Sequence, residues 1–404
     1  MRSTKGFPGN GKAVAINHRR ISLAVASSFL LELVSKISPL LILHHAQKTL
    51  GIEQYGWSQT QIAFLETMQP FITFGFASYA LAITSGKGDA KDDLNRLFSP
   101  ILYLKTFNAL IVALVYLAYF LWRGNVLNVL DYLVFGVMLL TSVLDFHWVC
   151  VVRHKIAMVS LVSGALRLAF LGLILTLVKS SDDKSLFVAL LIIPNAFVAM
   201  GTGYFAKSLA VFRVVKWEEL RRIFLDSIPF AILIIMITTF DRVDLFSVER
   251  WLGLEIVGIY SGPAKVIQSI STVLMALSLP FFAEILKVTD SDSLTKHLRL
   301  SFFFMSVLIS TIIFGMPFVE KDIAQLMFPA VAYESVRHLM SILSVSMVGS
   351  IFISVFGLQL LMSKGKPWPI IRGTFVYCLF FPIFVWAFGQ SHGQSNALKG
   401  RQLQ

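Results

Sequence analysis

Residues 187–205 read FVALLIIPNAFVAMGTGYF and contain no charged side chain. A helix of this length and composition can cross the hydrocarbon core of a bilayer, which takes about 20 apolar residues. Similar runs with few charges occupy residues 21–43, 101–122 and 373–388. Hydrophobic residues make up 56% of the 404 residues and charged residues only 14%, against roughly 25% charged residues in soluble domains. The sequence therefore predicts an all-α polytopic membrane protein and excludes soluble enzymes, fibrous proteins and disordered chains.

The apolar runs predict eleven membrane-spanning helices joined by short loops, with no extramembrane domain on either side. We expect them at residues 21–47, 57–84, 98–122, 126–150, 156–178, 185–206, 223–248, 256–286, 299–319, 335–362 and 367–389.

Lys and Arg residues favour one orientation in the membrane. With the N-terminus in the cytoplasm, the predicted cytoplasmic segments hold 20 of these residues and the opposite segments hold 9. Positive residues collect in cytoplasmic loops, where they meet anionic lipid. We therefore expect a cytoplasmic N-terminus, and we attribute the net charge of +12 to contact with membrane lipids rather than with nucleic acid.

A short motif occurs twice, half a chain apart. Residues 50–56 read LGIEQYG and residues 252–258 read LGLEIVG, with four of seven positions identical at an offset of 202. Each copy follows one predicted span and opens the next. This placement predicts an internal repeat of two six-helix lobes that run in the same direction, an arrangement suited to transporters in which one lobe rocks against the other.

The repeat divides the chain into five parts. A basic cytoplasmic segment at residues 1–20 precedes an N-terminal lobe of six helices at residues 21–206. A cytoplasmic linker at residues 207–222 leads to a C-terminal lobe at residues 223–389, where five spans are visible and a sixth is unclear. Residues 390–404 form a polar tail. The fold is thus expected to hold eleven or twelve transmembrane helices.

Four basic residues lie deep within predicted spans, where a charge is costly unless it faces water or an opposite charge. Arg167 is at the centre of the fifth span, so it either faces a polar cavity or pairs with a carboxylate of a neighbouring helix. Lys36 lies four residues after Glu32, a spacing that suits either an ion pair or a ligand site. Arg242 and Lys265 complete the set of candidate substrate-binding residues. Lys105, by contrast, is near enough to a span end for its side chain to reach the headgroups.

Acidic residues within spans are candidates for coupling transport to an ion. Asp241 and Asp244 are expected on one face of the seventh span, either at a water-accessible lobe interface or in a structural ion cluster. With Glu32 they form the predicted ion-coupling set. Four further acids could not be ranked from the sequence: Glu66, Asp145, Asp226 and Glu284.

No catalytic or metal-binding motif has a context that supports it. The two cysteines, Cys150 and Cys378, do not have metal-ligand spacing. A GxSxG match at residues 389–393 is not preceded by a strand, and a Walker-like match at residues 6–12 is followed by Ala13 instead of Ser or Thr. We therefore expect no enzyme activity, no metal and no cofactor.

The two motif-bearing regions resemble the polysaccharide flippases, the O-antigen and lipid-linked oligosaccharide translocases of the multidrug/oligosaccharidyl-lipid/polysaccharide exporter superfamily. The resemblance rests on residues 50–56 followed by Glu66, Pro70 and Gly75, and on Asp241 followed by LGLEIVGIY at residues 252–260, then by Ala264-Lys265 and Pro280. It covers most of the chain in topology and about 40 residues in motif.

The resemblance implies twelve to fourteen helices in two six-helix lobes around a V-shaped, cationic central cavity. It also implies transfer of an undecaprenyl-pyrophosphate-linked oligosaccharide to the outer leaflet of a bacterial cytoplasmic (inner) membrane. Polysaccharide polymerases and ligases would be candidate partners. Such a substrate agrees with the deep cations, because Arg binds phosphate oxygens through a fork of N–H groups. The chain departs from the family pattern in lacking a clear twelfth helix.

Three other functions remain open at this point. A drug/cation antiporter of the same superfamily would need a more acidic and aromatic cavity. A membrane enzyme, such as a polysaccharide polymerase or a glycosyltransferase, would need a larger outer loop or an aqueous domain to hold the sugar. A scaffold without transport activity would leave Arg167 and the repeat unexplained.

Overall fold

The computed structural model describes residues 40–84, 90–123, 129–153, 155–285, 290–328, 333–362 and 368–401, and all regular secondary structure in these ranges is helical. Most of the first predicted span lies outside the described residues, together with Glu32 and Lys36. The all-α prediction is confirmed. In the described part of the chain, seven helices are long and apolar enough to cross a membrane, against the eleven expected.

Before residue 210 the structure has these elements: α2 (Ile52–Thr73), α3 (Phe76–Thr84), α4 (Ala90–Arg123), α5 (Val129–Leu140), η1 (Thr141–Leu144), α6 (His147–Val152), α7 (Ile156–Leu177), η2 (Ser181–Asp183) and α8 (Lys184–Leu209). After it come α9 (Trp217–Phe240), α10 (Val243–Leu252), α11 (Leu254–Ile285), α12 (Ser291–Met327), α13 (Tyr333–Val345), α14 (Met347–Ile351), the π-helical η4 (Phe352–Met362) and α15 (Trp368–Arg401). Residues 40–50 are also helical.

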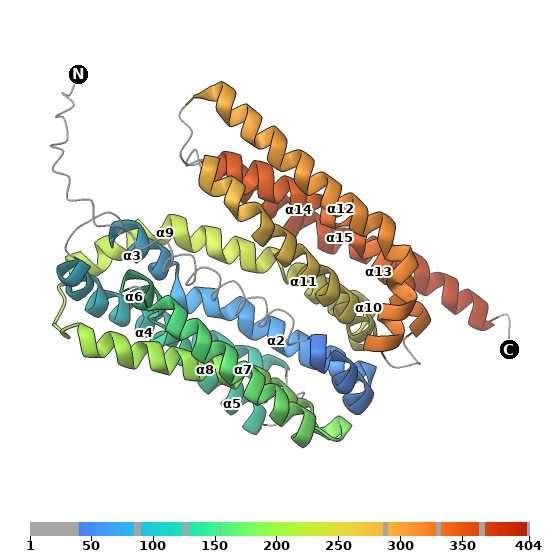
Figure 1. The fold of residues 1–404 in the computed structure, drawn as a ribbon. Helices are drawn as coiled ribbons and strands as arrows, with labels where there is room; N and C mark the ends of the chain where they lie inside the picture. The colour runs from blue at the N-terminus through green and yellow to red at the C-terminus, as the bar shows by residue number, and fades with distance from the viewer. Residues whose placement is uncertain are drawn as a thin grey trace.

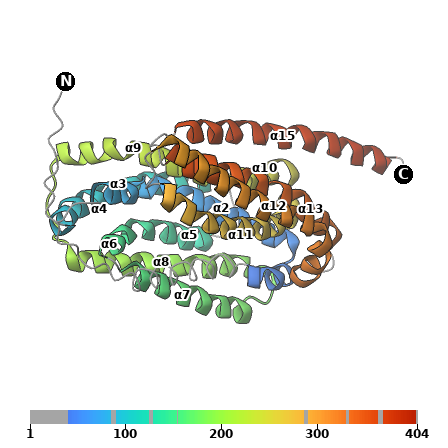
Figure 2. The same ribbon diagram turned by 45° about the horizontal axis from the view of Figure 1, so that its top comes forward.

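The helices lie roughly side by side in a bundle, with α2 and α11 in its middle. Figure 1 shows α4, α5, α7 and α8 on one side of α2, and α12, α13 and α14 beyond α11. The helix α11 packs on α2 and also on α12 and α13. Figure 2 shows α5, α7 and α8 on the opposite side of the bundle from α15. Apolar side chains fill the bundle in clusters, one of which joins α7 and α8 to α11, α12 and α13. Residues 390–401, predicted as a polar tail, continue α15.

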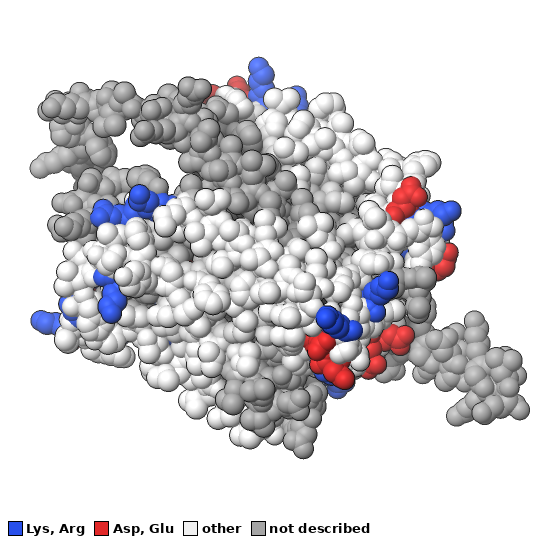
Figure 3. Space-filling view, turned by 60° about the horizontal axis from the view of Figure 1, so that its bottom comes forward, with Lys and Arg blue, Asp and Glu red and all other residues white. Residues whose placement is uncertain are grey.

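The surface has the charge distribution of a membrane-spanning bundle. Figure 3 shows a wide uncharged zone between Lys and Arg at one end and charges of both signs at the other. Large apolar side chains such as Leu114, Phe314 and Phe318 are exposed. Such residues suit a surface that faces lipid tails instead of water.

Loops on opposite sides of the predicted membrane gather at opposite ends of the bundle. At one end, the ammonium group of Lys184 donates to Gln54 Oε1 at 2.9 Å and lies 4.9 Å from the ring centroid of Trp57. At the other end, Val211 N donates to Asn95 Oδ1 at 3.0 Å. The predicted topology likewise places Gln54 and Lys184 on one side of the membrane and Asn95 and Val211 on the other.

The two motif copies adopt matching conformations. Gly51 and Gly253 immediately precede α2 and α11 and have φ angles of 80° and 92°, a region that glycine enters without steric cost. Gly56 and Gly258 lie where these two helices touch. A Cβ at Gly56 would be 2.0 Å from the carbonyl oxygen of Leu254, and one at Gly258 would be 2.0 Å from that of Ile52. Each motif thus supplies one glycine for a helix start and one for a reciprocal backbone contact.

In the residues that the structure describes, the tenth predicted span is interrupted at Ser346, and three others are broken as follows. The second breaks at Phe74 and Gly75, which have φ angles of 44° and 65°. The fourth breaks at residues 145–146, and the seventh at residues 241–242 between α9 and α10. The expectation that Asp241 and Asp244 share one face of a continuous helix is therefore wrong, because α9 ends at Phe240 before Asp244 is reached.

Candidate functional site

A pocket of about 420 Å³ lies among the three helix breaks. Its walls come from α2, α3, α4, α6 and α9 and from residues at the breaks themselves. Backbone that leaves helical geometry at membrane depth is tolerated where it lines a polar cavity or is buried in protein. The lining residues are Glu66, Gln69, Pro70, Thr73, Ala77, Lys105, Asp145, His147, Ile234, Thr238, Asp241 and Arg242.

An ion pair closes one side of this pocket. Arg242 Nη2 is 2.6 Å from Glu66 Oε2, and the two side chains keep 25% and 45% of their surface exposed. Glu66 belongs to α2, one turn before Pro70, and Arg242 is the residue directly before α10. The break between α9 and α10 therefore brings Arg242 to a carboxylate on another helix.

Lys265 lies further along the same interface, on α11. Its ammonium group donates to Gln59 Oε1 at 2.5 Å and lies 6.0 Å from the ring centroid of Tyr55. Tyr55, Gln59 and Glu66 are spaced by four and seven residues, so they lie along one face of α2.

Arg167 occupies the middle of α7 and is half-buried. Its Nη2 donates to Asn195 Oδ1 at 3.2 Å, so the hydrogen-bond partner is an amide of α8 and not the carboxylate considered as one alternative. Of the predicted cations that the structure describes, Arg242 pairs with Glu66, whereas Arg167 and Lys265 bond to amide side chains and are not part of the pocket lining.

The pocket lining carries charges of both signs. Glu66, Asp145 and Asp241 face it together with Lys105 and Arg242. Asp244 lies apart: Oδ2 accepts a hydrogen bond from the Tyr260 hydroxyl, and Oδ1 accepts one from Leu245 N. In the ranges that the structure describes, no group of three or more His, Cys, Asp or Glu side chains could hold a metal ion.

The sequence suggested that the Lys105 side chain extends toward the headgroups. In the structure it does not. Its side chain is buried, with 2% of its surface exposed. The ammonium group donates to the carbonyl oxygens of Ser142 and Asp145 and lies 4.9 Å from the ring centroid of Phe146. These carbonyls belong to the break in the fourth predicted span. The Ser142 carbonyl also accepts a hydrogen bond from Asp145 N, so Lys105 chiefly stabilises the Asp145 carbonyl at the break.

Replacing Lys105 with Met should destabilise the protein. The change removes the Lys105 donor from the Asp145 carbonyl, and an unsatisfied buried polar group typically costs about 1–3 kcal/mol. We expect the melting temperature in detergent to fall by several degrees for Lys105→Met. Lys207→Met, at an exposed position of α8, is the control and should melt as the wild type does. Equal melting temperatures for all three proteins would contradict this role of Lys105.

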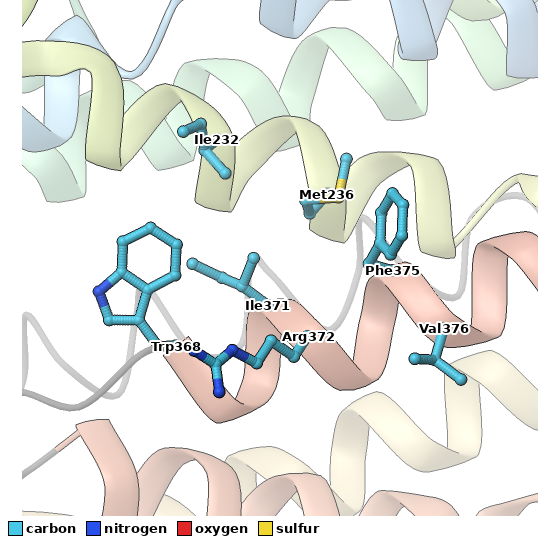
Figure 4. A pocket seen from close by; sticks show the side chains of 7 residues that line it. All are labelled: Ile232, Met236, Trp368, Ile371, Arg372, Phe375 and Val376. Atoms are coloured by element: carbon cyan, nitrogen blue, oxygen red, sulfur yellow. The ribbon is translucent and has the colours of Figure 1, made fainter.

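A second pocket, of about 630 Å³, lies between α9 and α15 (Figure 4). Its lining is apolar except for Arg372, and the other residues are Ile232, Met236, Trp368, Ile371, Phe375 and Val376. A lining of this kind suits hydrocarbon chains better than a charged headgroup.

Glu66 is the functional candidate that sequence reasoning did not rank. As one of four acids it had no distinguishing property, because its partner Arg242 lies far away in the sequence. The available signal was its register with Tyr55 and Gln59 on one face of α2.

A family model described as polysaccharide biosynthesis protein matches residues 24–286. This range covers more than half of the chain and includes both motif copies, Glu66, Arg167, Arg242 and Lys265. No curated protein and no solved structure matches the chain.

Proposed function

Because the chain belongs to the polysaccharide biosynthesis protein family, we propose that it is a flippase for a lipid-linked oligosaccharide. The substrate would be an undecaprenyl-pyrophosphate-linked repeat unit of O-antigen or another surface polysaccharide. The protein would carry it from the inner to the outer leaflet of a bacterial inner membrane.

The observation that carries this proposal is the position of Arg242, which lines the polar pocket and lies 2.6 Å from Glu66. A pyrophosphate headgroup is anionic and resists crossing hydrocarbon unless fixed positive charges replace its hydration. Arg242 is one such charge, and Lys265 and Arg167 are the further candidates. Their guanidinium and ammonium groups are those that bind phosphate oxygens in proteins.

We propose that transport proceeds by alternating access between two six-helix lobes around a central cavity. The reciprocal contact of Gly56 and Gly258 supports this mechanism, since it joins equivalent helices of the two predicted lobes at the outer end. The polar pocket lies deeper in the bundle, near the middle of α2. Separation of α2 from α11 would open a path from this pocket to the outer leaflet, while the prenyl chain stays in lipid.

The family match favours this function over a drug/cation antiporter and over a membrane enzyme. Members of the family are in general transporters and not enzymes, and the match is to a polysaccharide family and not to a drug antiporter. Glu32, Asp241 and Asp244 remain proposed as ion-coupling residues, with Asp241 on the pocket lining. Polysaccharide polymerases and ligases remain proposed partners.

Complementation tests the proposal in cells. The chain is expected to restore surface polysaccharide in a strain that lacks its own O-antigen flippase, and to move lipid-linked repeat units into the outer leaflet. The proposal would be contradicted if the protein accumulated in the membrane and repeat units stayed in the inner leaflet across a panel of polysaccharide types.

A further inference from the structure

Three of the polar side chains described above carry hydrogen-bond donors that have no acceptor. Within the described residues, Arg242 Nε, Arg167 Nε and Gln59 Nε2 are buried and have no hydrogen-bond partner. Only 3% of Gln59 is exposed, and its amide oxygen already accepts from Lys265. Buried donors are normally satisfied, and each unsatisfied one needs an explanation.

The Glu66–Arg242 pair is close but leaves bonding capacity unused. The two groups approach to 2.6 Å, yet neither Glu66 Oε2 nor Arg242 Nε forms an aligned hydrogen bond. A guanidinium can present two parallel N–H groups to one carboxylate or phosphate. Arg242 does not use its fork in this way, so a better acceptor can still replace Glu66.

Resting on the flippase function proposed above, we propose that Glu66 is a built-in counter-anion, which a phosphate group of the substrate displaces from Arg242. Without substrate, Glu66 balances cations that would be costly to leave bare at membrane depth. With substrate, phosphate oxygens accept hydrogen bonds from the Arg242 guanidinium. After transfer, Glu66 returns to Arg242 and helps to expel the product.

The position of Glu66 fits this exchange. It keeps 45% of its side-chain surface exposed and lines the polar pocket, so it can turn toward water when a phosphate takes its place. A permanently fixed ion pair would instead be closed off from the pocket. Because Glu66 competes with phosphate for Arg242, it lowers the affinity of the site for phosphate. A lower affinity helps a transporter to release its substrate.

Binding of inorganic pyrophosphate to the purified full-length protein in detergent tests this role. Glu66→Gln removes the competing charge and should bind pyrophosphate at least about tenfold more tightly than the wild type, because a unit charge in contact with the site acts strongly in partly dehydrated surroundings. Glu66→Asp keeps the charge on a shorter side chain, so it should lie between the two. Glu66→Asp also tests the proposal if Glu66→Gln does not fold.

The control is Glu53→Gln, an equal change of charge at an exposed position near the start of the same helix. Its affinity should match the wild type, and Arg242→Ala should lose binding. If Glu66→Gln or Glu66→Asp bound pyrophosphate no more tightly than the wild type while Arg242→Ala still lost it, Glu66 would merely position the cations and the proposal would be wrong. If no variant bound pyrophosphate, the anion site of the proposed flippase would fail as well.

Discussion

Alanine at Gly258 is expected to force α2 and α11 apart and to expose the interior of the bundle from the outer side. The new Cβ would lie 2.0 Å from a backbone carbonyl oxygen of Ile52. Ordinary contacts begin at 3.4 Å, so one helix must move by more than an ångström. Protein interiors transmit such a displacement because they are closely packed. No flexible side chain is available at this point to absorb it.

Cysteine accessibility measures this opening. Ser261, on α11, is 1% exposed, and a cysteine there should react slowly with an impermeant maleimide added outside cells. The background would carry Ser in place of Cys150 and Cys378. Adding Gly258→Ala should raise the labelling rate by about an order of magnitude or more, since a shift of 1.4 kcal/mol between closed and open states changes their ratio tenfold.

The matched control is Gly201→Ala in α8, where a Cβ meets nothing within 4 Å. It should leave the labelling rate unchanged, and Gly56→Ala should act like Gly258→Ala. If Gly258→Ala accumulated normally and Ser261→Cys reacted no faster than in the parent, the contact would not close the outer end.

Loss of Arg242 is expected to have the largest effect on transport. Arg242→Ala removes the cation that approaches Glu66 to 2.6 Å and leaves that carboxylate without its nearest opposite charge. Because both groups are partly exposed, we expect only a small loss of stability, about 1 kcal/mol. Export should nevertheless be abolished. Arg242→Lys should restore part of it, since an ammonium group keeps the charge but lacks the fork.

Export of repeat units, normalised to the amount of protein in the membrane, is the measurement. Arg250→Ala, at an exposed position of α10, the helix that Arg242 directly precedes, is the control and should export normally. Arg167→Ala should also reduce export, as the sequence predicted, but less than Arg242→Ala, because Arg167 lies outside the pocket lining. Normal export by Arg242→Ala would show that Arg242 does not bind the substrate.

The sequence predicted the family and the helical class because both depend on local patterns. Apolar runs identify spans directly, and the resemblance first seen in residues 50–56 and 252–260 was confirmed by the family match. The repeat was visible as identity at a fixed offset. That identity could not reveal that Gly56 and Gly258 meet each other, because contact between helices depends on how the two halves pack.

The helix breaks were missed for a related reason. Residues 223–248 form one apolar run in the sequence. Hydropathy averaged over such a run does not reveal a break at Asp241 and Arg242. The polar DRVD stretch was noticed but placed on a continuous helix. The structure gives its members separate partners, with Arg242 on Glu66 and Asp244 on Tyr260. Such partners lie on other helices, so no pattern within the run could have predicted them.

Lys105 was misjudged for the same reason. Snorkelling was inferred from its distance to a span end, whereas its acceptors are carbonyl groups freed by a break in another helix. Buried polar groups are placed by tertiary structure, and sequence position alone decides only how far they are from the membrane surface.

Transfer of a lipid-linked oligosaccharide in reconstituted vesicles tests the central claim most directly. Vesicles would carry the purified protein and an undecaprenyl-pyrophosphate-linked repeat unit, and a sugar-modifying reagent that does not cross membranes would report the exposed fraction over time. With the wild-type protein, repeat units of the inner leaflet should become accessible much faster than in protein-free vesicles, and Arg242→Ala should abolish the difference. Equal rates with and without the protein, across several repeat-unit structures, would contradict the account.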